Sequence, residues 1–287
     1  MTDPRSLDLA EGRLAALSWG DASAPAWLAL HGWLDNAASF ARLAPLLVER
    51  LGIRVVAIDF SGHGLSVPLP GEGDYALWDY CHDLLDACDS LGIEKATLLA
   101  HSMGAGVACL TAAALPERVS RLMLIDGLGA LTTDSGDVPK QLRKGLLAHR
   151  RPVSPPPRYP DVRTAVAARV AGGATRIDTE TAQPLVERNL IALPDGRVQL
   201  RTDGRLLRPS PLRLSPEQLL AILATIRCPL LLMEGAAGIL GDREVAQRLR
   251  SVVSGLERRV LKGGHHLHLE PGSVAVVADT ILAWYRS

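Results

Sequence analysis

One serine in this chain has the neighbours that a reactive hydroxyl needs. In LLAHSMGAG (98–106), an apolar stretch typical of a strand ends at Ala100, and a helical pattern begins after Ser102. So tight a turn strains the serine backbone and leaves room only for small residues two positions before and after it. The turn lifts the hydroxyl to a helix N-terminus, where the amide of Met103 faces a developing negative charge. The pattern predicts attack on a carbonyl group; a serine that only caps a helix is the alternative.

A histidine-rich segment further along the chain can supply the base for this serine. GGHHLHLEP (263–271) directly follows the strand-like stretch RRVLK (258–262), so its histidines lie on a loop at the end of a strand. Because parallel strands end at the same edge of a sheet, this loop is expected over the edge that carries Ser102. An imidazole in that place accepts the serine proton as a general base.

These segments are positioned by an alternation of strands and helices. Short apolar runs alternate with longer amphipathic patterns from about residue 25 onward, which indicates a parallel sheet covered by helices on both faces. Helical patterns occupy residues 39–52, 75–92 and 274–285. The expected strands are AWLAL (26–30), RVVAI (54–58), ATLLA (96–100), RLMLI (121–125), PLLLM (229–233) and RRVLK (258–262).

The alternation is interrupted between residues 128 and 215. This segment holds helical patterns separated by loops such as RRPVSPPPRYP (150–160), and it has no strand that would extend the sheet. We therefore predict a core domain in two parts, 1–127 and 216–287, with residues 128–215 inserted as a helical lid over Ser102.

Several of these segments together resemble the alpha/beta-hydrolases. HGWLDNAASF (31–40), DFSGHGLS (59–66), AHSMG (100–104), LMLIDGLG (122–129) and the histidine loop are similar to the branch called serine hydrolase-like proteins, and so is RVQLRTDGRL (197–206). The resemblance runs through nearly all of the chain outside the lid. It implies the alpha/beta-hydrolase fold, with a mostly parallel central sheet flanked by helices, and a Ser-His-acid triad acting on an ester-type substrate.

The resemblance also assigns roles to individual residues. It implies that the backbone amide of Trp33, after the first predicted strand, holds the oxyanion together with that of Met103. In this fold the base typically stands five residues before a glutamate, which selects His265 because Glu270 follows it at that spacing. DFSGHGLS is a structural turn shared by such proteins, so His63 is expected to be architectural.

The other two histidines of the loop, His266 and His268, are interpreted as neighbours of His265, one of them lining the pocket. A metal cluster of all three is the alternative, but three ligands within four loop residues rarely converge without helper carboxylates. We therefore expect no metal. No nucleotide-binding glycine pattern follows the first strands, so we expect no organic cofactor either.

The triad acid is missing from its usual place. Three residues after Gly235, where relatives carry a carboxylate, this chain has Gly238. The acid must then come from another loop at the same edge. Asp126 ends the strand RLMLI, and some relatives of this fold place their acid after that strand; an Asp-Gly turn without catalytic role is the alternative. Asp242, four residues beyond Gly238, is the second candidate, and Asp126 is the one we predict.

Composition restricts the possible partners and location. The chain has 287 residues, of which 47% are hydrophobic and 22% charged, as in soluble globular proteins. A formal net charge of zero gives no reason to expect nucleic acid as a partner. The sequence shows neither a signal peptide nor a run of about 18 apolar residues, so we expect a cytoplasmic protein without a membrane span. The four cysteines form no CxxC pair and are expected to be free.

Two functions from different classes follow from these observations. The first is a serine hydrolase that cleaves a small-molecule carboxylic ester or thioester through an acyl-enzyme on Ser102, with His265 as base. The second is a catalytically weak or inactive protein that binds a small ligand in the same pocket, and it is motivated by the missing acid at Gly238.

Overall fold

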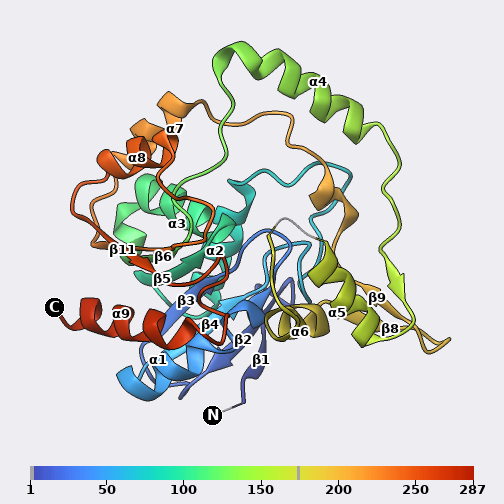
Figure 1. Cartoon of the computed structure of the whole chain (residues 1–287), viewed down its shortest axis with the longest axis horizontal. Coiled ribbons are helices and arrows are strands. Elements are labelled where there is room, and N and C mark those ends of the chain that lie inside the picture. Colours follow the sequence, from blue (N-terminus) through green and yellow to red (C-terminus); the bar gives the residue numbers. More distant parts are fainter. Residues whose placement is uncertain (1–2, 173–174) are drawn as a thin grey trace.

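An eight-stranded sheet forms the centre of the protein (Figure 1). The computed structural model describes residues 3–172 and 175–287. In the strand order β1-β2-β4-β3-β5-β6-β10-β11, β2 is antiparallel to both neighbours, and all pairs from β4 to β11 are parallel. The strands are β1 (Arg5–Leu9), β2 (Leu14–Trp19), β3 (Ala26–Leu30), β4 (Arg54–Ile58), β5 (Ala96–His101), β6 (Val119–Ile125), β10 (Leu230–Gly235) and β11 (Leu256–Leu261).

The six predicted strands all lie in this sheet, whereas the hairpin of β1 and β2 has no counterpart in the sequence prediction. Its turn contains Ala10 and Glu11 with φ angles of 50° and 57°, followed by Gly12. Left-handed backbone in a hairpin turn is normally supplied by Gly, Asn or Asp. Ala10 and Glu11 are not among these residue types, so the sequence carries only a weak turn signal here.

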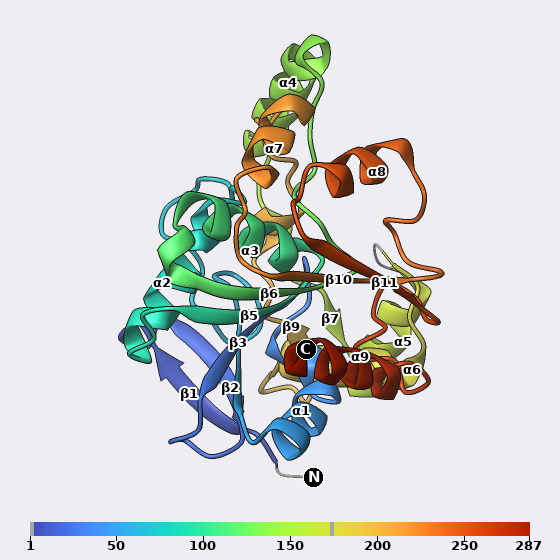
Figure 2. The same cartoon turned by 90° about the vertical axis from the view of Figure 1, so that its left-hand side faces the viewer.

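Helices cover both faces of the sheet, which confirms the predicted fold class of a mostly parallel sheet flanked by helices (Figure 2). Alternate residues of β6 pack into two separate hydrophobic cores. Leu122 and Leu124 belong to one core, and Met123 and Ile125 belong to the other. All four side chains are fully buried, which explains why the inner strands are continuously apolar. On one face lie α1 (Leu43–Leu51) and α9 (Val274–Arg286), and on the other α2 (Asp79–Ser90), α3 (Met103–Ala114), α7 (Pro216–Leu223) and α8 (Glu244–Ser251).

The segment between β6 and β10 is an insertion with its own small sheet. It contains α4 (Val138–His149), α5 (Val162–Ala171), α6 (Thr179–Arg188) and the strands β7 (Arg158–Tyr159), β8 (Leu190–Ala192) and β9 (Val198–Leu200), in the order β7-β9-β8. Among the described residues, these strands pair only with one another. The insertion thus holds three short strands besides the expected helices, and none of them extends the central sheet. Strands of two or three residues are too short to give a periodic signal in the sequence.

Short 3-10 helices occupy several connections between these elements. They are η1 (Ala37–Phe40), η2 (Pro116–Arg118), η3 (Ser135–Asp137) and η4 (Gly204–Leu207). Asn36 begins η1, and its side-chain oxygen accepts the backbone N–H of Ala38 at 3.0 Å. This cap fixes the loop that leads from β3 into α1.

Polar contacts anchor the insertion to the loops that follow β3 and β4. Arg188, the last residue of α6, forms an ion pair with Asp59 at 2.9 Å, and the Asp59 side chain has no exposed surface. Asp59 also accepts two backbone N–H groups from its surroundings. The side chain of Asn36 donates to the carbonyl oxygen of Leu185 in α6 at 2.7 Å. The insertion is thus fixed to the carboxyl edge of the sheet, where β3 and β4 end.

Two further observations concern the cysteines and the helix lengths. Cys81, Cys88, Cys109 and Cys228 are all free. Across residues 3–172 and 175–287, no helix is long and apolar enough to cross a membrane.

We expect Arg188→Met to lower the free energy of unfolding by about 3–5 kcal/mol, because it leaves the buried carboxylate of Asp59 without its countercharge. Denaturation in urea measures the difference. Arg197→Met is the matched control, since Arg197 is 49% exposed and pairs with the exposed Asp195. Its loss is expected to leave the free energy of unfolding almost unchanged, because water already screens this exposed pair. Equal effects of the two substitutions would contradict an anchoring role of Arg188.

Candidate active site

Ser102 lies in a strained turn between β5 and α3. Its φ and ψ angles are 51° and −113°, in a region that side chains rarely adopt. The backbone N–H of Ser102 holds the turn in place, because it donates to the carbonyl oxygen of Ile125 at 3.1 Å. A Cβ atom at Gly104 would lie 2.4 Å from the carbonyl oxygen of Leu30, which explains the small residue two positions after the serine. The hydroxyl makes no capping bond to α3, so the capping alternative does not describe this serine.

A continuous row of hydrogen bonds joins Ser102, His265 and Asp126. The distance is 2.9 Å from Ser102 Oγ to His265 Nε2 and 2.6 Å from His265 Nδ1 to Asp126 Oδ2. When Nδ1–H donates to the carboxylate, Nε2 has its lone pair free to accept the serine proton. The structure therefore brings together the residues that the sequence proposes as nucleophile, base and acid, from the ends of β5, β11 and β6.

Backbone groups hold the Asp126 side chain in its place. This residue has no exposed surface and a left-handed φ angle of 42°. Its backbone N–H donates to the carbonyl oxygen of Met233 in the neighbouring strand β10 at 2.7 Å. Its carboxylate accepts the N–H groups of Gly235 at 3.2 Å and Ile239 at 2.8 Å. The loop after β10 thus binds the acid, although it does not carry it.

Gly238 provides the space that the Asp126 carboxylate occupies. A Cβ atom at Gly238 would lie 2.2 Å from Asp126 Oδ1 and 2.5 Å from Oδ2, which no neighbouring pair of atoms tolerates. The second candidate acid, Asp242, is 81% exposed and pairs with Arg258 at 3.2 Å. The structure therefore brings Asp126 to His265 and leaves Asp242 at the surface.

Glu270 fixes the loop that carries His265. Both of its carboxylate oxygens accept the backbone N–H of Gly264, at 3.0 and 2.9 Å, and Ser273 Oγ lies 3.3 Å away. The carboxylate five residues after the histidine thus binds the residue immediately before it. This contact gives a physical reason for the spacing from which the sequence selected His265.

The three histidines of this loop face three different partners. His266 Nε2 lies 3.0 Å from Asp35 Oδ2, and His268 Nε2 lies 2.7 Å from Ser39 Oγ. Because His265 faces Ser102 and Asp126 instead, the three imidazoles do not converge on one point. Burial lowers the pKa of His268 well below its ordinary value, so its ring is neutral at neutral pH.

Two further buried histidines fix the loops after β3 and β4. Burial lowers the pKa of His31 to about 4 and that of His63 to about 3, so both are neutral at neutral pH. His31 Nδ1–H donates to the carbonyl oxygen of Gly32 at 2.7 Å, and its Nε2 accepts the backbone N–H of Phe60 at 3.0 Å. His63 packs against the His31 ring at 5.0 Å between centroids. The structure places both rings in loop packing.

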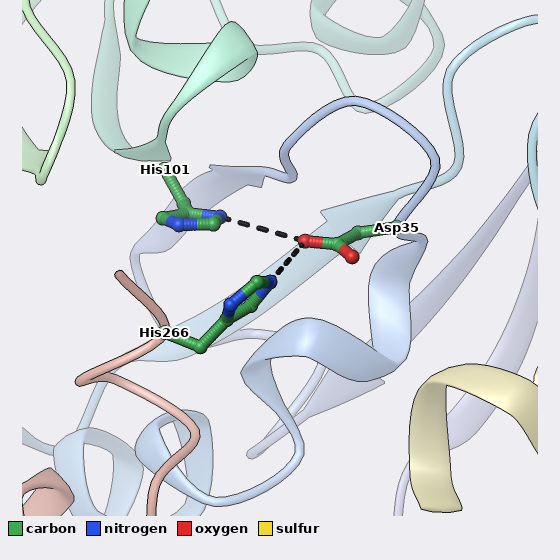
Figure 3. A group of neighbouring side chains, drawn as sticks. All are labelled: Asp35, His101 and His266. Carbon is green, nitrogen blue, oxygen red and sulfur yellow. Dashed lines mark hydrogen bonds and ion pairs between the residues drawn. The ribbon is translucent and has the colours of Figure 1, made fainter. Parts of the chain in front are cut away.

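Two buried polar residues beside Ser102 and His265 have no role in the sequence prediction (Figure 3). His101 immediately precedes Ser102, and its Nε2 lies 2.9 Å from the carbonyl oxygen of His265. Asp35 lies 3.6 Å from the other nitrogen of His101, and burial lowers the pKa of His101 well below its ordinary value. A usable signal was present in each case: an acid within HGWLDNAASF and an imidazole at the end of a buried strand.

Trp33 and Met103, whose backbone amides the sequence predicts for the oxyanion, lie on two segments that a hydrogen bond joins. Met103 follows Ser102 as the first residue of α3, and Gly104 N–H donates to the carbonyl oxygen of His31 at 3.1 Å, which joins this turn to the loop after β3. The Trp33 ring is 42% exposed, and its Nε1–H donates to the carbonyl oxygen of Leu206 in the insertion at 3.1 Å. The start of α3 and the loop after β3, which carry these two residues, are thus in direct contact.

Comparisons with known proteins agree on one fold. The sequence pattern of the family described as alpha/beta hydrolase fold matches residues 25–271. A serine hydrolase-like protein of Dictyostelium discoideum is 32% identical over 269 residues, which span 90% of this chain and 74% of that protein. The crystal structure of a hypothetical protein from Pseudomonas aeruginosa is 39% identical with a TM-score of 0.89, covering 100% of both chains. A thioesterase domain from the curacin biosynthetic pathway is 27% identical with a TM-score of 0.81, covering 98% of this chain and 99% of that domain.

We expect Gly238→Ala to push the Asp126 carboxylate away from His265, because the added methyl group occupies the same space. The free energy of unfolding should fall by about 1–3 kcal/mol, as in other overpacked interiors. Proton NMR of the His265 Nδ1–H resonance reports the hydrogen bond directly and should move upfield. Gly136→Ala is the control, since a Cβ atom at Gly136 meets nothing within 4 Å. An unchanged resonance in Gly238→Ala would show that the two groups do not compete for space.

Proposed function

The chain belongs to the alpha/beta-hydrolase fold family, in its serine hydrolase-like branch, and on this premise we propose that it cleaves a carboxylic ester or thioester with Ser102 as nucleophile. The observation that carries the proposal is the row of hydrogen bonds from Asp126 through His265 to Ser102. The row offers a hydroxyl, a base that can take its proton, and a carboxylate that orients the base.

Acyl transfer would run in two halves. Ser102 Oγ attacks the substrate carbonyl carbon while His265 Nε2 takes the hydroxyl proton, and the backbone N–H groups of Trp33 and Met103 stabilise the resulting oxyanion. The tetrahedral intermediate breaks its bond to the leaving alcohol or thiol, which receives that proton from His265. Water, deprotonated by His265, then attacks the acyl-enzyme and releases the acid together with free Ser102.

Asp126 would do two things in this cycle. Its hydrogen bond to His265 Nδ1–H keeps the proton off Nε2 in the resting site, and its negative charge stabilises the imidazolium formed during each half-reaction. The N–H groups of Gly235 and Ile239 hold the carboxylate in the orientation for both tasks. The binding-protein alternative was motivated by the missing acid at Gly238, and the contact between Asp126 and His265 removes that motivation.

We further propose that residues 128–215 act as a lid between the core parts 1–127 and 216–287 and shape the acyl pocket. The contact from Trp33 Nε1–H to Leu206 supports this, because it joins the insertion to a loop of the proposed oxyanion hole. α4 exposes Leu142, Leu146 and Leu147 at 36%, 54% and 47%, as a surface for apolar chains would. The similarity to a thioesterase domain supports including thioesters among the substrates.

We expect Ser102→Ala to lose about 10⁴-fold or more of the activity on short nitrophenyl esters, because the nucleophile is removed. Labelling with a fluorophosphonate should map to Ser102 and disappear in the variant. Ser154→Ala, at an exposed serine of the insertion, is the control and should keep full activity. Full activity of Ser102→Ala, or a label on a different residue, overturns the proposal.

Asp126→Asn should lose about 10³–10⁴-fold in kcat on the same ester with folding intact, because the amide favours the wrong tautomer of His265. Asp242→Asn makes the same chemical change at the surface and should alter kcat less than about threefold, since its side chain is 81% exposed. A loss confined to Asp242→Asn would place the acid on the loop after β10. Negligible native turnover with both variants unchanged would favour the binding protein.

Replacing α4 and its flanks, residues 135–151, by a short Gly-Ser linker should change the ratio of kcat/KM between long-chain and short-chain esters about tenfold or more. The core should stay folded, since Gly145 is the one buried residue of α4. An unchanged rate of fluorophosphonate labelling is the control for an intact site. An unchanged ester preference argues against a lid that includes α4.

A further inference from the structure

Asp35, His101 and His266 form a compact cluster of polar side chains (Figure 3). His101 directly precedes Ser102 in the chain, and His266 directly follows His265. Their exposed fractions are 4%, 0% and 2%. One ring nitrogen of each histidine points at the same carboxylate oxygen: Asp35 Oδ2 lies 3.0 Å from His266 Nε2 and 3.6 Å from His101 Nδ1. The cluster therefore joins the loop after β3, the last residue of β5 and the loop after β11.

His101 cannot satisfy both of its neighbours as a neutral imidazole. Its Nε2 lies 2.9 Å from the carbonyl oxygen of His265, an atom that can only accept, so the single ring proton belongs on Nε2. Nδ1 then presents a bare lone pair to the Asp35 carboxylate, and it has no hydrogen-bond partner among the described residues. Two electron-rich atoms that face each other in a buried site repel unless a cation lies between them.

We propose that Asp35, His101 and His266 form a binding site for a transition-metal ion of the zinc type. The three ligand atoms lie within 4.8 Å of one another. Three atoms no more than 4.8 Å apart share a point within about 2.8 Å of each. Shifts of less than about 1 Å therefore bring all three to the roughly 2.0–2.2 Å that Zn²⁺ keeps from imidazole nitrogens and carboxylate oxygens. Gly32 leaves the necessary room, because a Cβ atom there would lie 2.9 Å from His101 Nδ1 and 3.2 Å from Asp35 Oδ2.

The outer contacts of both histidines fit this role. A ligating imidazole usually donates its other N–H to an oxygen, which fixes the tautomer and the ring orientation. The outer nitrogen of His101 faces the carbonyl oxygen of His265 at 2.9 Å, and that of His266 faces Thr175 Oγ1 at 3.5 Å. Binding also requires that the His266 proton, directed at Asp35 without the ion, moves from Nε2 to Nδ1.

The site proposed here uses a different set of ligands from the three-histidine cluster that the sequence analysis weighed as an alternative. That cluster would have used His265, His266 and His268 without a carboxylate. The structure gives His266 a carboxylate, Asp35, and a second imidazole, His101, which come from distant parts of the chain. A helper carboxylate is what the loop histidines alone lacked.

An ion in this site would inhibit the proposed hydrolysis, and this part of the inference rests on the proposed function. The ring of His265 lies 4.5 Å from that of His101 and 5.2 Å from that of His266, centroid to centroid. A divalent cation held by these two rings repels the imidazolium that His265 must form during acyl transfer. Two ligands are also chain neighbours of Ser102 and His265, so binding restrains both reacting groups.

A proton is the one competing occupant that the site itself suggests. Protonation of both nitrogens of His101 would satisfy its two neighbours, but it would place an imidazolium among the rings of His265, His266 and His268, at centroid distances of 4.5, 4.9 and 4.3 Å. Nitrogen-15 NMR of chelator-treated protein separates the cases, because an imidazolium has two protonated ring nitrogens. An imidazolium at His101 that persists when Zn²⁺ is added overturns the proposal.

The decisive experiment measures Zn²⁺ binding to chelator-treated full-length protein, with Co²⁺ absorption as a second probe. We expect one ion per chain, and we expect Asp35→Asn and His266→Gln each to weaken binding about 100-fold or more. His268→Gln is the matched control, because it removes a fully buried imidazole of the same loop that bonds to Ser39 instead, and it should bind as the native chain does.

X-ray absorption of the Zn²⁺ complex of the native chain covers the case in which the variants fail to fold. It should show two nitrogen ligands and one oxygen ligand from the protein at about 2.0–2.2 Å. Absence of stoichiometric binding, equal binding by all three variants, or a different ligand set overturns the site.

Ester hydrolysis by the native chain should fall at least tenfold on saturation with Zn²⁺ and recover with EDTA. The rate of ester hydrolysis by Asp35→Asn and by His266→Gln should be the same with and without added Zn²⁺. Binding without inhibition overturns the regulatory part and leaves the site in place. A protein that hydrolyses no ester refutes the proposed function, while the binding measurements still decide whether the metal site exists.

Discussion

The hydrogen bond between Asp126 and His265 sets the shape of the carboxyl edge of the sheet. The acid follows β6 and the histidine follows β11, and β10 lies between these two strands. The loop after β10 must therefore leave a passage for the contact. Its glycines make this possible: a Cβ atom at Gly238 would overlap the Asp126 carboxylate, and one at Gly235 would lie 2.3 Å from the carbonyl oxygen of Gly264. Gly238, the position at which the sequence lacks the expected carboxylate, thus leaves the space in which Asp126 contacts His265.

The sequence predicted the parts of the protein that depend on local pattern. The six predicted strands and the strained serine follow from patterns within a few residues, and the structure has each of them there. The family resemblance selects His265 through its spacing to Glu270, and the structure places this histidine 2.9 Å from Ser102. The choice between Asp126 and Asp242 remained open, because spacing along one loop cannot show which of two neighbouring loops reaches the histidine. Asp35 and His101 lie far apart in the chain, so no local sequence pattern predicts that their side chains come together. The hairpin of β1 and β2 escaped because its turn uses residues that rarely adopt left-handed backbone.

The loop after β3 connects the proposed site to the insertion. Within a few residues it carries the Trp33 amide proposed for the oxyanion, the buried Asp35 beside His266, and Asn36, whose side chain binds α6. A displacement of α6 therefore acts on the loop through Asn36, and a change at Asp35 acts on it from the other side. Burial and hydrogen bonding at both ends make this loop a rigid link rather than a free connection. The function proposed for the insertion and the reactivity proposed for Ser102 thus depend on one short segment.

The distances along the chain between the three reacting residues bear on the order in which the site is completed. Ser102 and Asp126 each follow a strand of the single unit β5-α3-β6, in which His101 of β5 is the direct partner of Ile125 of β6. His265 lies 163 residues from Ser102 and 139 residues from Asp126. The proposed nucleophile and acid can take their places as soon as this unit forms, whereas His265, the proposed base, reaches them only when β10 and β11 have joined the sheet. On the proposed mechanism, a nascent or partly folded chain has an inert serine, and the onset of its reactivity during refolding marks the pairing of the last strand.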